Sequence, residues 1–191
     1  MPRARHVHHL KATRHVDDRG WFCETFSSAR MAAIGIEASF VQDNQSWSRR
    51  RGTVRGLHFQ RPPAAQAKLV SCLRGRILDI VVDLRTGSPT FGHHLAIELG
   101  DNGDQIFIPE GFAHGFVTLT DDVLLSYKVS RLFDPGLDSG VAWDDPDLAI
   151  AWPLHGTEPI LSERDRALPR LSVLESPFAY GGEGPMILIS A

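Results

Sequence analysis

Short runs of β-branched and aromatic residues recur along most of the chain, separated by Gly, Pro, Asn and Asp. Runs of about four to eight such residues between turn signals are typical of short antiparallel strands. Many short strands at a spacing of about 8–12 residues favour an all-β sandwich or barrel. The pattern predicts strands at 21–26, 39–42, 53–59, 68–73, 77–84, 94–99, 105–108, 114–119 and 123–129.

Helical signals are few and short. One helix is expected at 28–34, where Gly35 supplies the usual C-terminal stop. A second is expected near 146–150. A third should begin at Ser162, because Ser-Glu-Arg-Asp resembles a capping box with Asp in its fourth position.

The length of 191 residues is enough for one well-buried domain. No internal repeat or linker divides the chain, so we expect a single domain over 1–191 with its core at about 20–170. The segment after Ser172 contains Gly and Pro and is expected to form a surface arm. Cys23 and Cys72 lie at strand-like positions, where they are expected to pack as small hydrophobes.

Composition and charge exclude several classes of function. A hydrophobic content of 42% and a charged content of 23% are ordinary for a globular protein. A formal net charge of −3 and a pI of about 6.3 argue against capture of nucleic acid or anionic membrane by charge. No apolar run approaches the ~20 residues of a membrane span, and no secretory signal is evident. We therefore expect a cytoplasmic protein.

The segment Gly52-Thr-Val-Arg-Gly-Leu-His-Phe-Gln60 is the main candidate for chemistry. Its alternation places His58 on one face of a strand and Arg55 on the other. A His on a buried sheet face, with Lys68 ten residues further on, costs free energy unless it is hydrogen-bonded or used. Because imidazole takes and gives protons near neutral pH, the pattern indicates proton abstraction.

Nine segments in consistent order extend over nearly the whole chain. They are Asp18–Glu24, Phe40–Asn44, Val54–Gln60, Gln66–Val70, Ser88–Gly92, Ile108–Val117, Tyr127–Lys128, Trp143–Asp147 and Ile150–Pro153. Together they resemble the dTDP-4-dehydrorhamnose 3,5-epimerase family from about Gly20 to Pro169. The resemblance implies a cupin-type jelly roll (double-stranded β-helix), usually found as a homodimer.

The resemblance also implies a reaction. The family inverts C3 and C5 of dTDP-4-dehydro-6-deoxy-D-glucose to give dTDP-4-dehydro-L-rhamnose, on the way to dTDP-L-rhamnose. The 4-keto group acidifies both neighbouring C–H bonds, so a base can form an enolate and an acid can return a proton to the opposite face. The expected partners are the nucleotide sugar and a second copy of the chain, with no cofactor, nucleic acid or membrane.

Four residues match the family's catalytic positions. His58 would be the base, and Asp165 the carboxylate that orients it and stabilises the imidazolium. Asp165 can also be interpreted as a helix-capping acid, and the two roles are compatible. Tyr127 would be the opposing acid. Lys68 would place its ammonium where negative charge develops on the oxygen at C4.

Further positions match residues that hold the substrate in the family. Arginine suits a diphosphate because its planar fork donates two hydrogen bonds at once. Phe133 falls where the family stacks a ring on thymine, although ordinary packing explains it nearly as well. Asp138 and Arg164 stand where the family more often has Glu and Lys. The full set is Arg19, Glu24, Gln42, Asn44, Arg55, His114, Phe133, Asp138 and Arg164.

His114 raises the alternative of a metal-binding cupin. It ends a Pro-x-Gly-x-x-His segment, which metal-binding cupins combine with a His-x-His pair and a Glu. The earlier segment here, Leu57-His-Phe-Gln60, has one His and no Glu. Too few ligands remain, so we expect no metal and place His114 near the sugar.

Other functions on the same scaffold stay open. An enzyme that epimerises only C3 or only C5 could keep the same base and acid, and Trp21 and Cys23 depart from the family near the sugar. A 3,4-ketoisomerase would use the same enolate but return the proton to oxygen. A non-catalytic sugar-binding cupin would usually have lost His58, Lys68 or Tyr127, which are all present.

Overall fold

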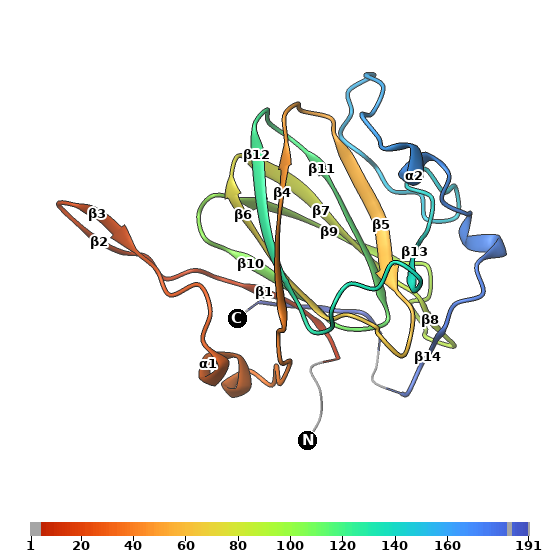
Figure 1. Cartoon of the computed structure of the whole chain (residues 1–191), viewed down its shortest axis with the longest axis horizontal. Coiled ribbons are helices and arrows are strands. Elements are labelled where there is room, and N and C mark those ends of the chain that lie inside the picture. Colours follow the sequence, from red (N-terminus) through yellow and green to blue (C-terminus); the bar gives the residue numbers. More distant parts are fainter. Residues whose placement is uncertain (1–4, 183–184, 191) are drawn as a thin grey trace.

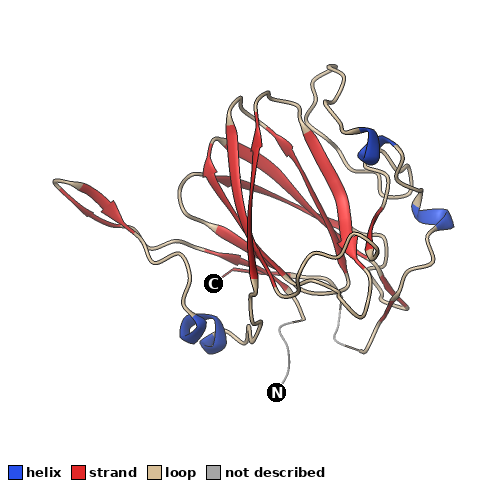
Figure 2. Ribbon diagram, in the orientation of Figure 1, coloured by secondary structure: helices blue, strands red, loops and turns tan. Residues whose placement is uncertain are grey.

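Two β-sheets packed face to face form the body of the molecule (Figures 1 and 2). The structure is a computed structural model that describes residues 5–182 and 185–190. The six-stranded sheet has the order β15 (Leu188–Ser190), β1 (Val7–Leu10), β10 (Gln105–Ile108), β6 (Lys68–Arg74), β12 (Val123–Val129) and β4 (Gln42–Ser48). The five-stranded sheet has the order β13 (Asp138–Gly140), β5 (Val54–Gln60), β11 (Phe112–Thr118), β7 (Arg76–Asp83) and β9 (His94–Gly100).

The remaining elements are short. Two small sheets pair β2 (His15–Asp17) with β3 (Gly20–Phe22), and β14 (Phe178–Ala179) with β8 (Arg85–Thr86). The helices are α1 (Ser28–Ala33), α2 (Glu163–Arg166) and one 3₁₀ turn (Leu171–Val173). No helix within 5–182 and 185–190 is long and apolar enough to cross a membrane. The arrangement is the cupin-type jelly roll.

Apolar side chains are buried on both faces of the five-stranded sheet. On β7, Ile77 and Val81 point into the core between the sheets. Ile80 and Val82 point to the outer face, which the chain segment after β13 covers. A strand covered on both sides reads as a continuous apolar run rather than an alternating one. Each large apolar side chain buried in this way contributes about 1.5–3 kcal/mol.

The structure confirms the strands predicted from the strongest apolar runs. β5, β6, β7, β9, β10, β11 and β12 lie within two residues of the predicted bounds. The strand expected at 39–42 is wrong, because pairing with β12 begins only at Gln42 and continues to Ser48. That strand is polar and lies at a sheet edge, so it carries little apolar signal.

Two of the three predicted helices form. α1 and α2 match the expected positions, and the Ser162 side chain caps α2 by accepting from the Asp165 backbone N–H at 3.1 Å. The helix expected near 146–150 is wrong. Instead the chain turns there, and Ala149 adopts φ +46°, which ends any helical run.

The chain after the 3₁₀ turn runs over the surface and is anchored at several points. β14 pairs in parallel with β8, and β15 pairs in parallel with β1. The Phe178 ring meets the Phe59 ring edge-on at 5.6 Å, and Met186 is buried in the core between the sheets. These contacts connect the segment to both sheets.

The β2–β3 hairpin projects away from the body (Figure 1). Its apolar side chains are exposed, with Trp21 at 57% and Phe22 at 68%. An isolated two-stranded hairpin is marginally stable in water. The hairpin thus leaves two aromatic rings largely exposed.

Strand β5 departs from regular alternation at Gly56. Its register on β11 shifts, so that His58 lies opposite His114 while Arg55 lies opposite Phe116. Directly paired residues share a face, and both β11 residues face the space between the sheets, so Arg55 and His58 also share that face. The prediction that Arg55 points away from His58 is therefore wrong. One extra residue in β5, a β-bulge, is the cause.

Two glycines allow the close approach of the strands at this bulge. A Cβ on Gly56 would lie 2.6 Å from the Gly115 Cα, and a Cβ on Gly115 would lie 2.7 Å from the Arg55 carbonyl oxygen. Both obstructing atoms belong to the backbone, so neither can move without shifting a strand.

We predict that Gly115→Ala lowers the free energy of unfolding by about 1–3 kcal/mol, the range typical of overpacking. Denaturant unfolding of both proteins measures the difference. Gly100→Ala is the matched control, because its nearest neighbour is the flexible Arg76 side chain at 3.5 Å. Equal stability of Gly115→Ala and the wild type would contradict the tight contact.

Candidate active site

Polar side chains from both sheets meet in the otherwise apolar space between them. Along β12, Tyr127 lies opposite Asn44 of β4 and Val70 of β6. Val129 lies opposite Gln42 and Lys68 in the same way. The six-stranded sheet thus contributes Lys68, Tyr127, Gln42 and Asn44 to one inner face.

His58 of β5 forms a close pair with Asp165 of α2. His58 Nε2 lies 2.6 Å from Asp165 Oδ1, and the side chains are 26% and 5% exposed. An ionised carboxylate only accepts hydrogen bonds, so Nε2–H is the donor. Nδ1 of the neutral ring therefore carries the lone pair and is the basic atom.

Protonation of the pair follows from its surroundings. Burial lowers the pKa of His58, and Asp165 offsets part of that effect. Burial acts to raise the pKa of Asp165, but the hydrogen bond and charge of His58 are among the contacts that hold it below its usual range. At neutral pH the pair is a neutral imidazole beside a carboxylate, which is the state a general base requires.

Lys68 reaches across from β6 to the opposite sheet. Its Nζ donates a hydrogen bond to the His58 carbonyl oxygen at 3.3 Å. Burial lowers the pKa of Lys68 to about 8, although the charges of Asp138 and Asp79 act in the opposite direction. The ammonium form therefore predominates at pH 7, and it lies beside the base.

Tyr127 is half-buried on β12 and packs against the apolar core. Burial raises the pKa of its phenol, so the hydroxyl keeps its proton at neutral pH. His58 and Tyr127 belong to different sheets that face each other. A base and an acid on opposing walls can act on opposite faces of a flat intermediate bound between them.

The short helix α2 supplies two charged residues in succession. Asp165 contacts His58, and the preceding Arg164 forms an ion pair with Asp138 of β13 at 2.5 Å. The two family departures at Asp138 and Arg164 thus contact one another.

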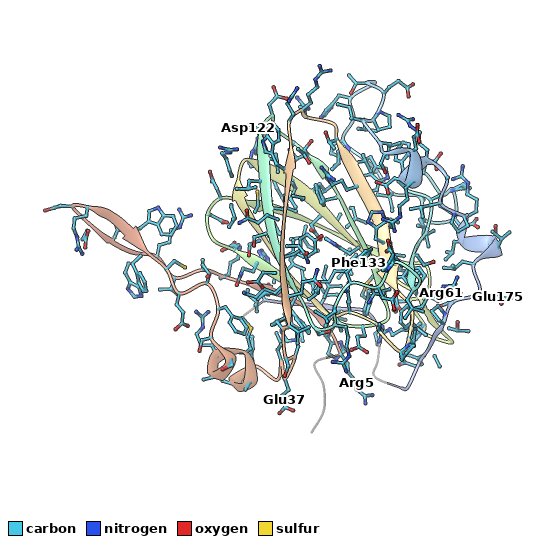
Figure 3. The ribbon with its side chains drawn as sticks, viewed as in Figure 1. Arg5, Glu37, Arg61, Asp122, Phe133 and Glu175 are labelled. Atoms are coloured by element: carbon cyan, nitrogen blue, oxygen red, sulfur yellow. The ribbon has the colours of Figure 1, made fainter. Side chains whose placement is uncertain are left out.

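Gln42, Asn44 and Arg55 form polar contacts beside the exposed ring of Phe133. Gln42 donates to Asn44 Oδ1 at 2.8 Å and accepts from the Phe133 backbone N–H at 2.9 Å. Arg55 donates to Ser48 Oγ at 3.2 Å. In Figure 3, Phe133 lies over the strands of the body, far from the hairpin, and it is 54% exposed.

Arg19 and Glu24 are not brought to this site within one chain. Arg19 lies at the projecting hairpin, where it forms an ion pair with Asp17 at 2.5 Å. Glu24 pairs with Arg30 of α1 at 3.3 Å. Their assignment to the substrate stays a prediction.

His114 lies beside His58 and has its own buried carboxylate. Its Nε2 is 2.8 Å from Oδ2 of Asp79, on the neighbouring strand β7. Sequence reasoning missed Asp79, although a lone acid inside the apolar run Ile77-Leu-Asp-Ile-Val81 was a signal.

Among the described residues, no three His, Cys, Asp or Glu side chains converge as metal ligands. Cys23 and Cys72 are free thiols, and Cys72 is buried.

The chain is similar to known proteins over most of its length. A sequence model of the family described as dTDP-4-dehydrorhamnose 3,5-epimerase matches residues 4–173. The dTDP-4-dehydrorhamnose 3,5-epimerase of Methanothermobacter thermautotrophicus is 50% identical over 154 residues, which cover 80% of this chain and 82% of that protein.

Solved structures share the fold closely. The dTDP-6-deoxy-D-glucose-3,5-epimerase of Legionella pneumophila, in complex with dTDP-4-keto-L-rhamnose, has a TM-score of 0.84 and 37% identity, covering 92% of this chain and 99% of that one. A 3′-monoepimerase of Streptomyces bikiniensis, in complex with dTDP-quinovose, has a TM-score of 0.81 and 36% identity, covering 90% and 88%.

We predict that the pKa of His58 lies below the ordinary value of about 6.5, and that Asp165→Asn lowers it further. The substitution keeps the burial that disfavours the imidazolium but removes the charge that favours it. NMR titration of histidine labelled with ¹⁵N, assigned with His58→Ala, measures both values. Asp144→Asn removes an exposed carboxylate paired with Arg170 and is the control. A His58 pKa that Asp165→Asn leaves unchanged would contradict the pairing.

Proposed function

Because this chain belongs to the dTDP-4-dehydrorhamnose 3,5-epimerase family, we propose a role for each active-site residue, with His58 as the base and Tyr127 as the acid. The chain is an isomerase that epimerises C3 and C5 of dTDP-4-dehydro-6-deoxy-D-glucose through an enolate, giving dTDP-4-dehydro-L-rhamnose. The 2.6 Å contact between His58 Nε2 and Asp165 is the main support for the proposal. Nε2 donates its hydrogen bond to the carboxylate, so Nδ1 remains to accept a proton from the substrate.

In the first step, His58 Nδ1 takes the proton from the carbon beside the 4-keto group. The C–H electron pair moves into the C–C bond, and the carbonyl oxygen becomes an enolate oxygen. Asp165 stabilises the imidazolium that forms, as a carboxylate partner does in other histidine bases. Lys68 donates to the enolate oxygen, where a fixed positive group acts on charge that appears only during reaction.

In the second step, the Tyr127 hydroxyl returns a proton to the same carbon from the opposite side. The position of Tyr127 on the sheet facing His58 supports this role. The resulting phenolate recovers a proton, and His58 loses its own, before the second carbon reacts. The same base, acid and ammonium then act on the other carbon next to the keto group.

The remaining polar residues bind the nucleotide sugar. Arg55 and Arg164 would contact the diphosphate, with Asp138 holding the Arg164 guanidinium in place. Gln42 and Asn44 line the inner face beside Tyr127, and His114 would contact the sugar. Phe133, which is exposed, would stack on the thymine.

The active enzyme is a homodimer in this proposal. The projecting hairpin carries exposed Trp21 and Phe22, together with Arg19. The hairpin would insert into the partner's site, which buries the two rings and delivers Arg19 and Glu24 to the substrate. Each active site would then be completed by its neighbour.

We expect the wild-type enzyme to incorporate deuterium at C3 and C5 of dTDP-4-dehydro-6-deoxy-D-glucose in D₂O, with inversion at both. His58→Ala should slow exchange at both carbons by about 10²–10⁴-fold. Tyr127→Phe should impair inversion more than exchange, because proton removal does not need the acid. Mass spectrometry and NMR follow both quantities.

His93→Ala is the matched control, since His93 is exposed and follows a turn outside the site. Full activity of His58→Ala would show that the base is misassigned. Exchange at one carbon alone would identify a single-site epimerase, like the Streptomyces bikiniensis enzyme named above. Equal loss of exchange and inversion in Tyr127→Phe would give Tyr127 a structural role.

Mixing inactive variants tests the crossed hairpin. In a heterodimer of Arg19→Ala and His58→Ala, one site keeps His58 from one chain and Arg19 from the other, so random reassociation should restore about a quarter of wild-type activity. His58→Ala mixed with Lys68→Met is the control, because both losses fall within one barrel and no site is intact. Failure of the first mixture to regain activity would refute the crossed arrangement.

A further inference from the structure

Asp79 is a buried carboxylate that has no role in the mechanism proposed above. It lies in the middle of β7, opposite Phe116 of β11 and Ile97 of β9. Both partners belong to the core between the sheets, so Asp79 faces that core. Its side chain is 0% exposed. A carboxylate in such a place strongly destabilises a protein unless it is compensated.

One carboxylate oxygen of Asp79 accepts a hydrogen bond from the described residues and the other does not. Oδ2 accepts from His114 Nε2 at 2.8 Å. Oδ1 is buried and accepts no hydrogen bond from any group within the described part of the chain. An acceptor of this kind points to a donor that approaches from the active-site space.

The Lys68 ammonium has more hydrogen-bond donors than it has acceptors among the described residues. An ammonium carries three donors, and one is used on the His58 carbonyl oxygen. Among the residues that the structure describes, no second acceptor takes a hydrogen bond from Nζ. The enolate oxygen would use another donor, which leaves one for a carboxylate. Asp79 is also one of the two acids whose charge raises the pKa of Lys68 against the effect of burial.

We propose that Asp79 is a positioning residue of the active site: the charge on its unpaired Oδ1 attracts and holds the Lys68 ammonium, which lies beyond hydrogen-bond distance in this structure, and its Oδ2 fixes the His114 ring. The proposal rests on the enolate mechanism given above and adds a second histidine–carboxylate pair to it. The anchor holds Lys68 on the side of the pocket where the enolate oxygen forms. Because Asp79 accepts from Nε2, the Nδ1 atom of His114 is left to meet the sugar.

Asp138 is the competing counter-charge and has the larger effect of the two on the pKa of Lys68, but two features separate it from Asp79. Asp138 already pairs with Arg164 at 2.5 Å, and its side chain is 17% exposed, so solvent and the guanidinium screen it. The titratable and charged groups around Lys68 are His58, Asp79, His114, Tyr127, Asp138 and Arg164.

Asp79→Asn tests the anchor, because Asn keeps the shape and an acceptor for His114 but loses the charge. The chain has three lysines, Lys11, Lys68 and Lys128, so ¹³C-labelled lysine gives three side-chain signals to titrate by NMR. We expect the pKa of Lys68 to fall by about 1 unit, the low end of the effect of an opposite charge. Lys11 and Lys128 pair with Asp104 and Asp43 and should not change.

Activity should move with the ionisation of Lys68. The ammonium is lost as pH rises through about 8 in the wild type, so the alkaline limb of the rate profile should shift to lower pH by the same amount in Asp79→Asn. kcat should fall more than KM rises, because the anchor serves the enolate. Asp145→Asn removes another buried carboxylate, at 3% exposure, outside the site, and should leave the Lys68 pKa unchanged.

An unchanged Lys68 pKa in folded Asp79→Asn would overturn the proposal. Should that variant fail to fold, Asp79→Asn with Lys68→Met removes both members of the pair and should fold; failure of the double variant would also overturn it. The titration needs no substrate, so it separates the two hypotheses. Wild-type exchange without a shift would refute the Asp79 anchor, whereas a shift without wild-type exchange would refute the proposed function.

Discussion

The need to compensate charge in a largely buried space governs this active site. His58, Lys68 and Asp79 lie in the space between two sheets that also encloses a large apolar core. Every ionised group there needs a partner of opposite charge or a hydrogen bond. Asp165 meets that need for His58. The same environment strengthens the electrostatic interactions that catalysis uses.

The jelly roll divides the work between its sheets. The five-stranded sheet presents His58, His114 and Asp79, while the six-stranded sheet presents Lys68 and Tyr127. A flat enolate bound between the sheets would meet proton acceptor and proton donor on opposite faces. Inversion then follows from the architecture of a sandwich, and it requires no movement of the sugar between the two proton transfers.

Strands covered on both sides were predictable because their apolar runs are long and bounded by turns. β7 and β11 are of this kind, whereas edge strand β4 is polar and left no such trace. The family resemblance identified His58 and Asp165, but neither could be placed 2.6 Å apart from sequence spacing alone. The face of Arg55 could not be predicted, because the bulge at Gly56 depends on the fit of β5 against Gly115 of β11. Asp79 was overlooked because one acid in an apolar run resembles a sequence irregularity until its partners are seen.

Helix α2 is barely one turn long, yet in the proposed mechanism its adjacent residues serve two ends of the substrate. Arg164 would face the diphosphate, while Asp165 holds the base near the sugar carbons. Ser162 caps the turn that carries both residues, so in the proposed mechanism a phosphate that contacts Arg164 would also restrain the orientation of His58. Binding of the nucleotide would thereby help to align His58 with the reacting carbon, as when remote binding energy is used for catalysis. A free sugar without its nucleotide would then be converted more slowly as well as bound more weakly.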